Sequence, residues 1–155
     1  MESQELTAPA AARAYILFVV AGTTYAAESH RVRHLEMVEH VTPVPNSPPF
    51  IEGVVLTRGR VIPVVNLRVR FGFERASRDL RSRLLVVETA GRMVGLLADE
   101  AREFITIPDA SIHPPNDAIG GLTGAYLEGV TTIGGRIVLV LNIDDVIEAV
   151  PAATP

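Results

Sequence analysis

The sequence contains neither cysteine nor lysine. Without cysteine the chain cannot form disulfides, thiolate zinc sites or cysteine nucleophiles, and it suits a reducing compartment. Without lysine it lacks the phosphate-binding lysine of a P-loop and any lysine Schiff base, which excludes two large enzyme classes. Codon bias in the genome is the simplest explanation for a chain whose 14 basic residues are all arginine.

Long apolar runs are also missing, although hydrophobic residues make up 48% of the 155 positions. No run approaches the about 20 residues that a membrane-spanning helix needs. The first residues, MESQELTAPAAARA, carry acids where a signal peptide would carry positive charge. We therefore expect a cytoplasmic protein that does not insert into a membrane.

The chain has no excess of positive charge, since its net charge is −4. Its arginines concentrate between Arg58 and Arg83, and residues 74–83 read ERASRDLRSR. Acids are interspersed in this segment and stacking aromatic residues are absent, whereas single-strand binders need rings as well as charge. We expect a solvated loop here and no nucleic-acid partner.

Catalytic motifs are absent as well. The sequence has no GxSxG elbow, no GxGxxG after a strand and no histidine beside an obvious serine nucleophile. The carboxylate pairs Asp144–Asp145 and Asp99–Glu100 fit a helix start and a hairpin end better than acid–base chemistry. The sequence predicts a protein that is not an enzyme and needs no cofactor.

The chain is rich in short β-branched runs that are separated by turns containing glycine. Three pairs of runs predict hairpins, because glycine accepts the positive φ of tight connections. The pairs are 15–22 with 25–29, 84–88 with 93–98, and 124–133 with 136–141. Tails at 1–13 and 151–155 would then flank one domain at 14–150.

Prolines leave little room for helix, and three short pieces are the candidates. Residues 30–37, HRVRHLEM, place Val32 and Leu35 at i and i+3. NLRVRF follows Val65, and NIDDVIEAV begins with Asn142, which can cap a helix.

One internal repeat bears on the fold. Residues 62–67 (IPVVNL) and 138–143 (VLVLNI) are each an apolar strand that leads through asparagine into a short helix. Each run has too few strands to bury both of its faces. The repeat therefore predicts two similar small barrels packed on each other.

Residues 51–57 and 60–65 are expected to pair as strands with Arg58-Gly59 as their turn. Gly59 supplies the permissive backbone, and Arg58 projects from a rigid loop where a partner can reach its guanidinium. The alternative is an arginine that only pairs with a neighbouring acid. Pro63 cannot donate a ladder hydrogen bond, so it marks an edge position or a bulge.

Several segments in order resemble the CheW family of chemotaxis coupling proteins. They are YAAES with RVRHL, then VTPVPNSPPFIEGV, RGRVIPVVNLR, MVGLLADEA and IVLVLNIDDVI. Together they run from about Tyr15 to Val150, nearly the whole chain. The resemblance implies an all-β fold of two intertwined five-stranded, SH3-like barrels with short helices. It also implies a non-enzymatic adaptor between the cytoplasmic tip of a chemoreceptor and the regulatory domain of a CheA-type histidine kinase, at receptor arrays.

The resemblance carries a receptor-binding groove onto this chain. The implied residues are Val32, His34, Leu35, Gly53, Arg58, Gly59, Gly95 and Asp99, and no kinase-binding residues can be named.

Three departures from the family pattern suggest an adaptor of an alternative chemosensory system. His34 stands where the family usually has an acid, Leu56-Thr57 replaces its asparagine–leucine pair, and Asn66 replaces its aspartate.

A second interpretation of the histidines remains open. His30, His34 and Glu36 could hold a metal or small ligand if residues 30–37 were helical, since residues four apart share a helix face. Otherwise these are partly exposed histidines that respond to pH.

Overall fold

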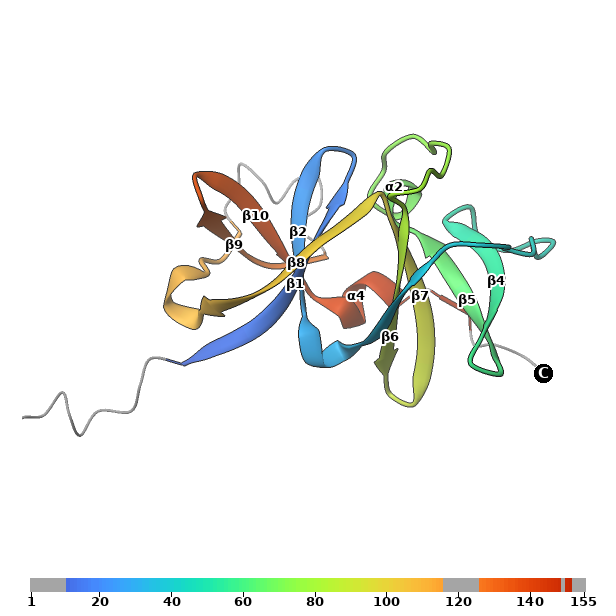
Figure 1. Ribbon diagram of the computed structural model, residues 1–155, viewed down its shortest axis with the longest axis horizontal. Coiled ribbons are helices and arrows are strands. Elements are labelled where there is room, and N and C mark those ends of the chain that lie inside the picture. The colour runs from blue at the N-terminus through green and yellow to red at the C-terminus, as the bar shows by residue number, and fades with distance from the viewer. Residues whose placement is uncertain (1–10, 116–125, 149, 152–155) are drawn as a thin grey trace, which may run out of the picture.

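The computed structural model describes residues 11–115, 126–148, 150 and 151. Its strands form two five-stranded sheets, each curled into a small barrel (Figure 1). Within the described residues, no helix has both the length and the apolar character needed to cross a membrane.

The first barrel has the strand order β8-β1-β2-β10-β9. Its strands are β1 (Ala12–Val20), β2 (Thr23–Glu28), β8 (Glu100–Pro108), β9 (Leu127–Ile133) and β10 (Arg136–Leu141). Alternate side chains point inward and bury a small core: Tyr15, Leu17, Ala26, Ile107, Val138 and Val140.

The second barrel has the order β3-β6-β7-β5-β4. Its strands are β3 (Val32–Met37), β4 (Ile51–Thr57), β5 (Arg60–Asn66), β6 (Arg83–Thr89) and β7 (Arg92–Ala98). Its interior is likewise apolar: Val41, Val55, Ile62, Val64, Leu84, Val86 and Leu97. The predicted all-β fold of two five-stranded barrels is confirmed.

The chain interleaves the two barrels. It starts the first barrel with β1 and β2, builds the whole second barrel with β3 to β7, and returns with β8 to β10 (Figure 1). The short helices α2 (Leu67–Arg70) and α4 (Ile143–Ile147), together with η1 (Ser29–Arg31) and η2 (Asp109–Ser111), complete the described elements.

The largest core lies between the barrels and joins residues of β1, β6, β7 and α4, including Phe18, Leu85, Leu96 and Val146. We call it the shared core. Since the chain's own side chains fill it, only its rim is left for a partner.

Arg70 links α2 to α4 and to two aromatic rings beside the shared core. Its guanidinium lies 4.5 Å from the centre of the Phe50 ring and 4.8 Å from that of Tyr126. It also donates a 2.8 Å hydrogen bond to the carbonyl of Val146 and a longer one, 3.3 Å, to that of Asp145. The side chain therefore stacks on two aromatic rings and caps the last turn of α4.

The internal repeat is longer in the structure than its apolar strands suggested. Residues 51–67 align without a gap onto 127–143, so that both hairpins have Glu-Gly-Val from their second residue onward and lead into an asparagine cap. Each first strand is crossed by a bridge, Thr42 to Val54 in one barrel and His113 to Val130 in the other. The two barrels therefore share one plan.

The helix expected over residues 30–37 is wrong, because η1 includes His30 and β3 begins at Val32. A register shift between Val32 and His34 inserts a bulge into β3. Because the bulge adds a residue, Val32 and Leu35 both pack on the shared core although they lie three apart. The spacing that indicated a helix is the spacing of a bulged strand.

The remaining local expectations have mixed outcomes. The helices after Asn66 and Asn142 and the hairpins at β1–β2 and β6–β7 are confirmed, as is β9–β10, apart from residues 124 and 125, which lie outside the described residues. Strand β1 already begins at Ala12, inside the expected tail. The expectation that Pro63 marks an edge position or a bulge is wrong, because it lies on the interior strand β5 opposite Val54. The backbone of Val54 bonds Thr42 instead, and β5 pairs with β7 only from Val64 onward, so the missing N–H of Pro63 interrupts no ladder.

Candidate functional site

The β4–β5 turn presents Arg58 outward. Arg58 and Gly59 have φ values of 51° and 80°, the two positive values of a tight hairpin turn, and both residues are exposed. Among the described residues the Arg58 side chain has no hydrogen bond or ion pair. Its guanidinium is therefore available to a partner, and the alternative of a pairing with a neighbouring acid is not seen there.

His34, Glu36 and Thr57 join the two edge strands of the second barrel. The His34 Nε2 lies 2.5 Å from Glu36 Oε2 and 3.3 Å from the Thr57 hydroxyl, which itself donates to Glu36 Oε2. His34 and Glu36 share a face because they are two apart along β3. Thr57 comes from β4, so the cluster closes the seam between β3 and β4 at this end.

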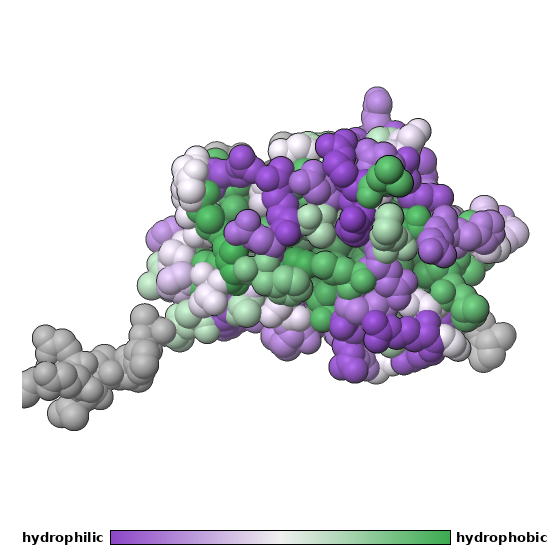
Figure 2. Space-filling view, in the orientation of Figure 1, coloured by the Kyte–Doolittle hydropathy of each residue, from purple (hydrophilic) through white to green (hydrophobic). Residues whose placement is uncertain are grey.

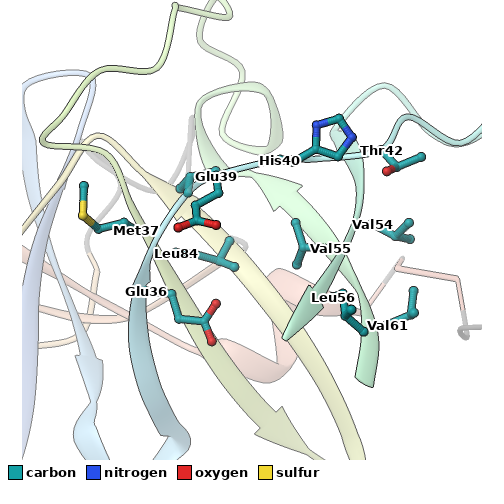
Figure 3. Close-up of a pocket in the computed structure, with 11 residues that line it drawn as sticks. Glu36, Met37, Glu39, His40, Thr42, Val54, Val55, Leu56, Val61 and Leu84 are labelled. Atoms are coloured by element: carbon teal, nitrogen blue, oxygen red, sulfur yellow. The ribbon is translucent and has the colours of Figure 1, made fainter. Parts of the chain in front are cut away.

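Beyond that cluster the seam opens into a cleft of about 660 Å³, which we call the β3–β4 cleft (Figure 3). Glu36, Met37 and Glu39 lie on its β3 side, and Val54, Val55 and Leu56 face them from β4, with Leu84 between (Figure 3). The cleft is also lined by Val38, His40, Thr42 and Val61. It combines an apolar floor with carboxylates at one rim.

The outer face of the β4–β5 hairpin is apolar and exposed. Leu56 and Val61 form a cross-strand pair and are 72% and 59% exposed. A neighbouring groove of about 410 Å³ contains Val44 and four prolines: Pro45, Pro48, Pro63 and Pro151. Large apolar side chains gathered on one hairpin are typical of a protein-binding surface.

The sequence analysis did not single out Leu56 and Val61. The signal was present, because β4 and β5 are apolar at neighbouring positions and not only at alternate ones. One face of such a hairpin fills the barrel, and the other must then be exposed or covered by a partner.

Two predicted site residues, Gly53 and Gly95, are buried and lie in one row with His34 across the second barrel, through Val86 and Val64. A side chain at Gly53 would meet the Thr42 carbonyl oxygen, and one at Gly95 would meet Leu84. These glycines permit close packing and present no group to a partner.

Val32 and Leu35 lie at the rim of the shared core, where they are partly buried. Phe104 on β8 pairs with Ile16, a shared-core residue, and is 60% exposed. Figure 2 shows apolar surface crossing the middle of the molecule, in the region where β8 runs from one barrel to the other. Phe104 is the functional candidate that sequence reasoning missed on this side.

Asp99 lies apart from the turn that carries Arg58. Strands β5 and β7 are parallel and pair Val64 with Gly95, which places the turn and Asp99 at opposite ends of the sheet. The Asp99 carboxylate accepts a 2.8 Å hydrogen bond from the backbone N–H of Ala21 and pairs with Arg68 at 2.8 Å. The hydrogen bond to the Asp99 carboxylate raises the pKa of Arg68. The eight residues predicted for one groove therefore occupy several places.

The proposed metal or small-ligand cluster is not assembled. His30 is exposed on η1, while His34 is held by Glu36 and Thr57. In the part of the chain that the structure describes, no three histidine, aspartate or glutamate side chains converge as metal ligands would.

Comparison with known proteins identifies the family. The model of the CheW-like domain matches residues 14–150. The chain belongs to the CheW family.

The chemotaxis protein CheW of Rhizobium meliloti is 30% identical over 134 residues, covering 86% of each chain. The chemotaxis protein CheW of Thermotoga maritima is 34% identical over 122 residues, covering 77% of this chain and 79% of the relative. The crystal structure of the scaffolding protein TtCheW from Thermoanaerobacter tengcongensis superimposes with a TM-score of 0.82 at 28% identity, covering 90% of this chain and 95% of that one.

Two departures of this CheW-family chain from the family pattern have a local explanation. Asn66 caps α2 by accepting a hydrogen bond from the Val69 N–H, as Asn142 caps α4. At the other position, Glu36 supplies a carboxylate beside His34, so the seam still contains an acid.

Proposed function

We propose that this protein is a chemotaxis adaptor that joins a chemoreceptor tip to the regulatory domain of a CheA-type histidine kinase. Family membership supports this role, as do relatives named as chemotaxis and scaffolding proteins. The single observation that carries it is the β4–β5 hairpin, on which Arg58 stands beside the exposed Leu56 and Val61. The protein acts by docking in the cytoplasm at receptor arrays and catalyses no reaction.

The receptor surface is the rim of the shared core. Val32 and Leu35 contribute apolar contacts from β3, and the exposed Phe104, which pairs with the shared-core residue Ile16, adds one from β8. A receptor tip is a helical hairpin, whose apolar ridge would pack on this rim. Arg58, exposed on the β4–β5 turn, would pair with a carboxylate or carbonyl of the receptor.

The other residues predicted for the groove shape this surface. Gly59 sets the turn that aims Arg58, His34 closes the seam below it, and Gly53, Gly95 and Asp99 hold the barrel frame.

The kinase surface is the outer face of β4–β5. Burying Leu56 and Val61 against an apolar face of the kinase regulatory domain would stabilise the complex by about 1.5–3 kcal/mol for each side chain. Val32 and Leu35 pack on the shared core, whereas Leu56 and Val61 are exposed and do not pack on it, so one adaptor can offer separate surfaces to the two partners.

Arg58→Ala tests the receptor assignment. We expect it to weaken binding of the receptor tip by about tenfold or more in calorimetric titration, because a desolvated arginine anchor is lost. The melting temperature should stay nearly unchanged, since Arg58 is exposed. Arg136→Ala is the matched control, because Arg136 is an exposed arginine on the corresponding hairpin of the first barrel.

Leu56→Ser tests the kinase assignment in the same assays. It should weaken binding of the kinase regulatory domain and leave receptor affinity unchanged. Normal receptor affinity for Arg58→Ala would contradict the receptor assignment, and normal kinase affinity for Leu56→Ser would contradict the kinase assignment.

His34 is the residue that would match this adaptor to an alternative chemosensory system. Exchanging His34 for glutamate places a second carboxylate beside Glu36, so we expect a shift in preference among receptor tips. Unchanged preference in a competition assay would contradict the idea.

A further inference from the structure

The loop between α2 and β6 ends in a closed turn that holds Leu80 outward. The backbone N–H of Asp79 donates to the Ser82 hydroxyl at 3.0 Å, and the Ser82 N–H donates to the Asp79 carbonyl at 3.1 Å. The Arg81 N–H donates to the Asp79 carboxylate at 2.8 Å. Leu80 is 83% exposed, more than any other large apolar side chain of the described residues. The hydrogen bonds of this turn thus hold Leu80 in an exposed position.

Arginines surround this leucine. Arg78, Arg81 and Arg83 lie within three positions of it. The side chain of Arg81 is 74% exposed and pairs with Asp79 at 3.2 Å, and that of Arg78 pairs with Glu52 at 3.4 Å. Arg83 donates to the Leu80 carbonyl at 2.7 Å, which fixes its guanidinium beside the turn. We call residues 78–83 the Leu80 tip: an exposed leucine flanked by three arginines and one aspartate, on a chain of net charge −4.

The β3–β4 cleft has the complementary properties. Its floor is apolar, and Glu36 and Glu39 stand on its β3 side (Figure 3). Glu39 is exposed and has no ion-pair partner among the described residues. Leu80 of the same chain does not line the cleft. A volume of about 660 Å³ leaves room for a leucine side chain and its neighbours.

Tip and cleft lie at one end of the same sheet. The β3–β6 register pairs Met37, which lines the cleft, with Arg83, which belongs to the Leu80 tip. A surface that carries a knob beside its complementary hole can pair with a second copy about a twofold axis, so that each knob enters the other's hole.

We propose that the β3–β4 cleft binds the Leu80 tip of a second copy of this chain, reciprocally, with Arg81 facing Glu39 of the partner. Two apolar insertions and two sets of opposite charges then form a symmetric dimer. The proposal does not rest on the adaptor role. Because Leu56 and Val61 also line the cleft, the dimer would exclude a partner docked on the β4–β5 face.

Sedimentation equilibrium of the full chain, from about 10 µM to about 1 mM, measures the dimer. We expect a reversible dimer that Leu80→Ser weakens about tenfold or more, because each interface loses a buried leucine. Phe104→Ser, which removes a comparably exposed apolar side chain from the first barrel, should leave the dimer unchanged. A monomer throughout the range, or a dimer insensitive to Leu80→Ser, would overturn the proposal.

Charge exchange tests the pairing itself. Arg81→Glu and Glu39→Arg should each weaken the dimer, and the double variant should recover much of the affinity; a double variant weaker than both singles contradicts the geometry.

Because the chain has no cysteine, a Leu80→Cys protein can be mixed with a Met37→Cys protein under oxidising conditions. We expect a disulfide-linked heterodimer. Its absence would speak against the contact independently of any change in folding.

Discussion

At the scale of single residues, Gly53 shows how the fold restricts a position. Its φ is +146°, and a Cβ built there would lie 2.1 Å from the Thr42 carbonyl oxygen. Thr42 approaches this closely because it exchanges two hydrogen bonds with Val54, at 2.8 and 2.9 Å. Gly129 in the first barrel is crowded in a similar way, since a Cβ there would lie 2.4 Å from the Ile112 side chain and 2.8 Å from the His113 carbonyl oxygen.

We expect Gly53→Ala to lower the free energy of unfolding by about 2–4 kcal/mol, since the crossing segment must move. Gly59→Ala is the matched control: its φ is +80°, but nothing lies within 4 Å. It should cost only about 1 kcal/mol, from backbone strain alone. Denaturant unfolding measures both, and equal costs would show that backbone conformation, not the Thr42 contact, sets the requirement.

Residues whose role is local could be identified from the sequence, and residues whose role depends on a distant segment could not. Gly59 and the caps Asn66 and Asn142 act within a few positions, so their patterns were sufficient. Gly53 is required by a segment that passes over it, and the Glu36 carboxylate meets His34 only because β3 is a strand.

At the scale of elements, Asp144 ties three segments together near the shared core. Its carboxylate accepts hydrogen bonds from Arg31 of η1 at 2.6 Å and from Thr89 of β6 at 2.5 Å, while Asp144 itself lies in the first turn of α4. The Thr89 hydroxyl and then Arg31 lower the pKa of Asp144. The side chain is 61% exposed, so solvent weakens the pair to at most about 1 kcal/mol.

Asp144→Asn should therefore lower the melting temperature by a few degrees at pH 7. A carboxyl whose pKa is lowered by folding stabilises the protein above its unfolded pKa of about 3.9, and that contribution fades as pH falls through the folded pKa. The difference between wild type and variant should shrink below about pH 4 in thermal melts. Asp145→Asn, on the same helix turn but without a described side-chain ion pair, should show a smaller pH-dependent difference; a gap at pH 3 as large as at pH 7 would contradict this role.

The hairpins were predictable because each is made by neighbouring residues and a glycine turn, as at β1–β2, β6–β7 and β9–β10. The strand β3 was mistaken for a helix because its bulge places Val32 and Leu35 on one face. A bulge depends on the partner strand, here β6, which lies some fifty residues away in the sequence. The residue pattern of β3 alone therefore does not indicate the bulge.

At the scale of the whole molecule, two barrels of one plan were predictable from the repeat, but their interleaving was not. The chain closes the first barrel only after completing the second, which no local pattern encodes. For the same reason, residues that were predicted to line one groove lie in different parts of the molecule. The parallel pairing of β5 with β7, for example, places Arg58 and Asp99 at opposite ends of a sheet. Leu56, Val61 and Phe104 were recognised as exposed only from the structure, which shows which face of each strand points outward.

The central claim is that one copy of this protein holds a receptor tip and a kinase regulatory domain at the same time, through the rim of the shared core and the β4–β5 face. The most direct measurement is size-exclusion chromatography with light scattering on a mixture of the adaptor with both partners encoded in the same genome. We predict a ternary complex of adaptor, receptor tip and kinase domain. Arg58→Ala should reduce the amount of receptor in this complex, and Leu56→Ser should reduce the amount of kinase domain. Two binary complexes that never combine, or no binding of either partner, would contradict the account.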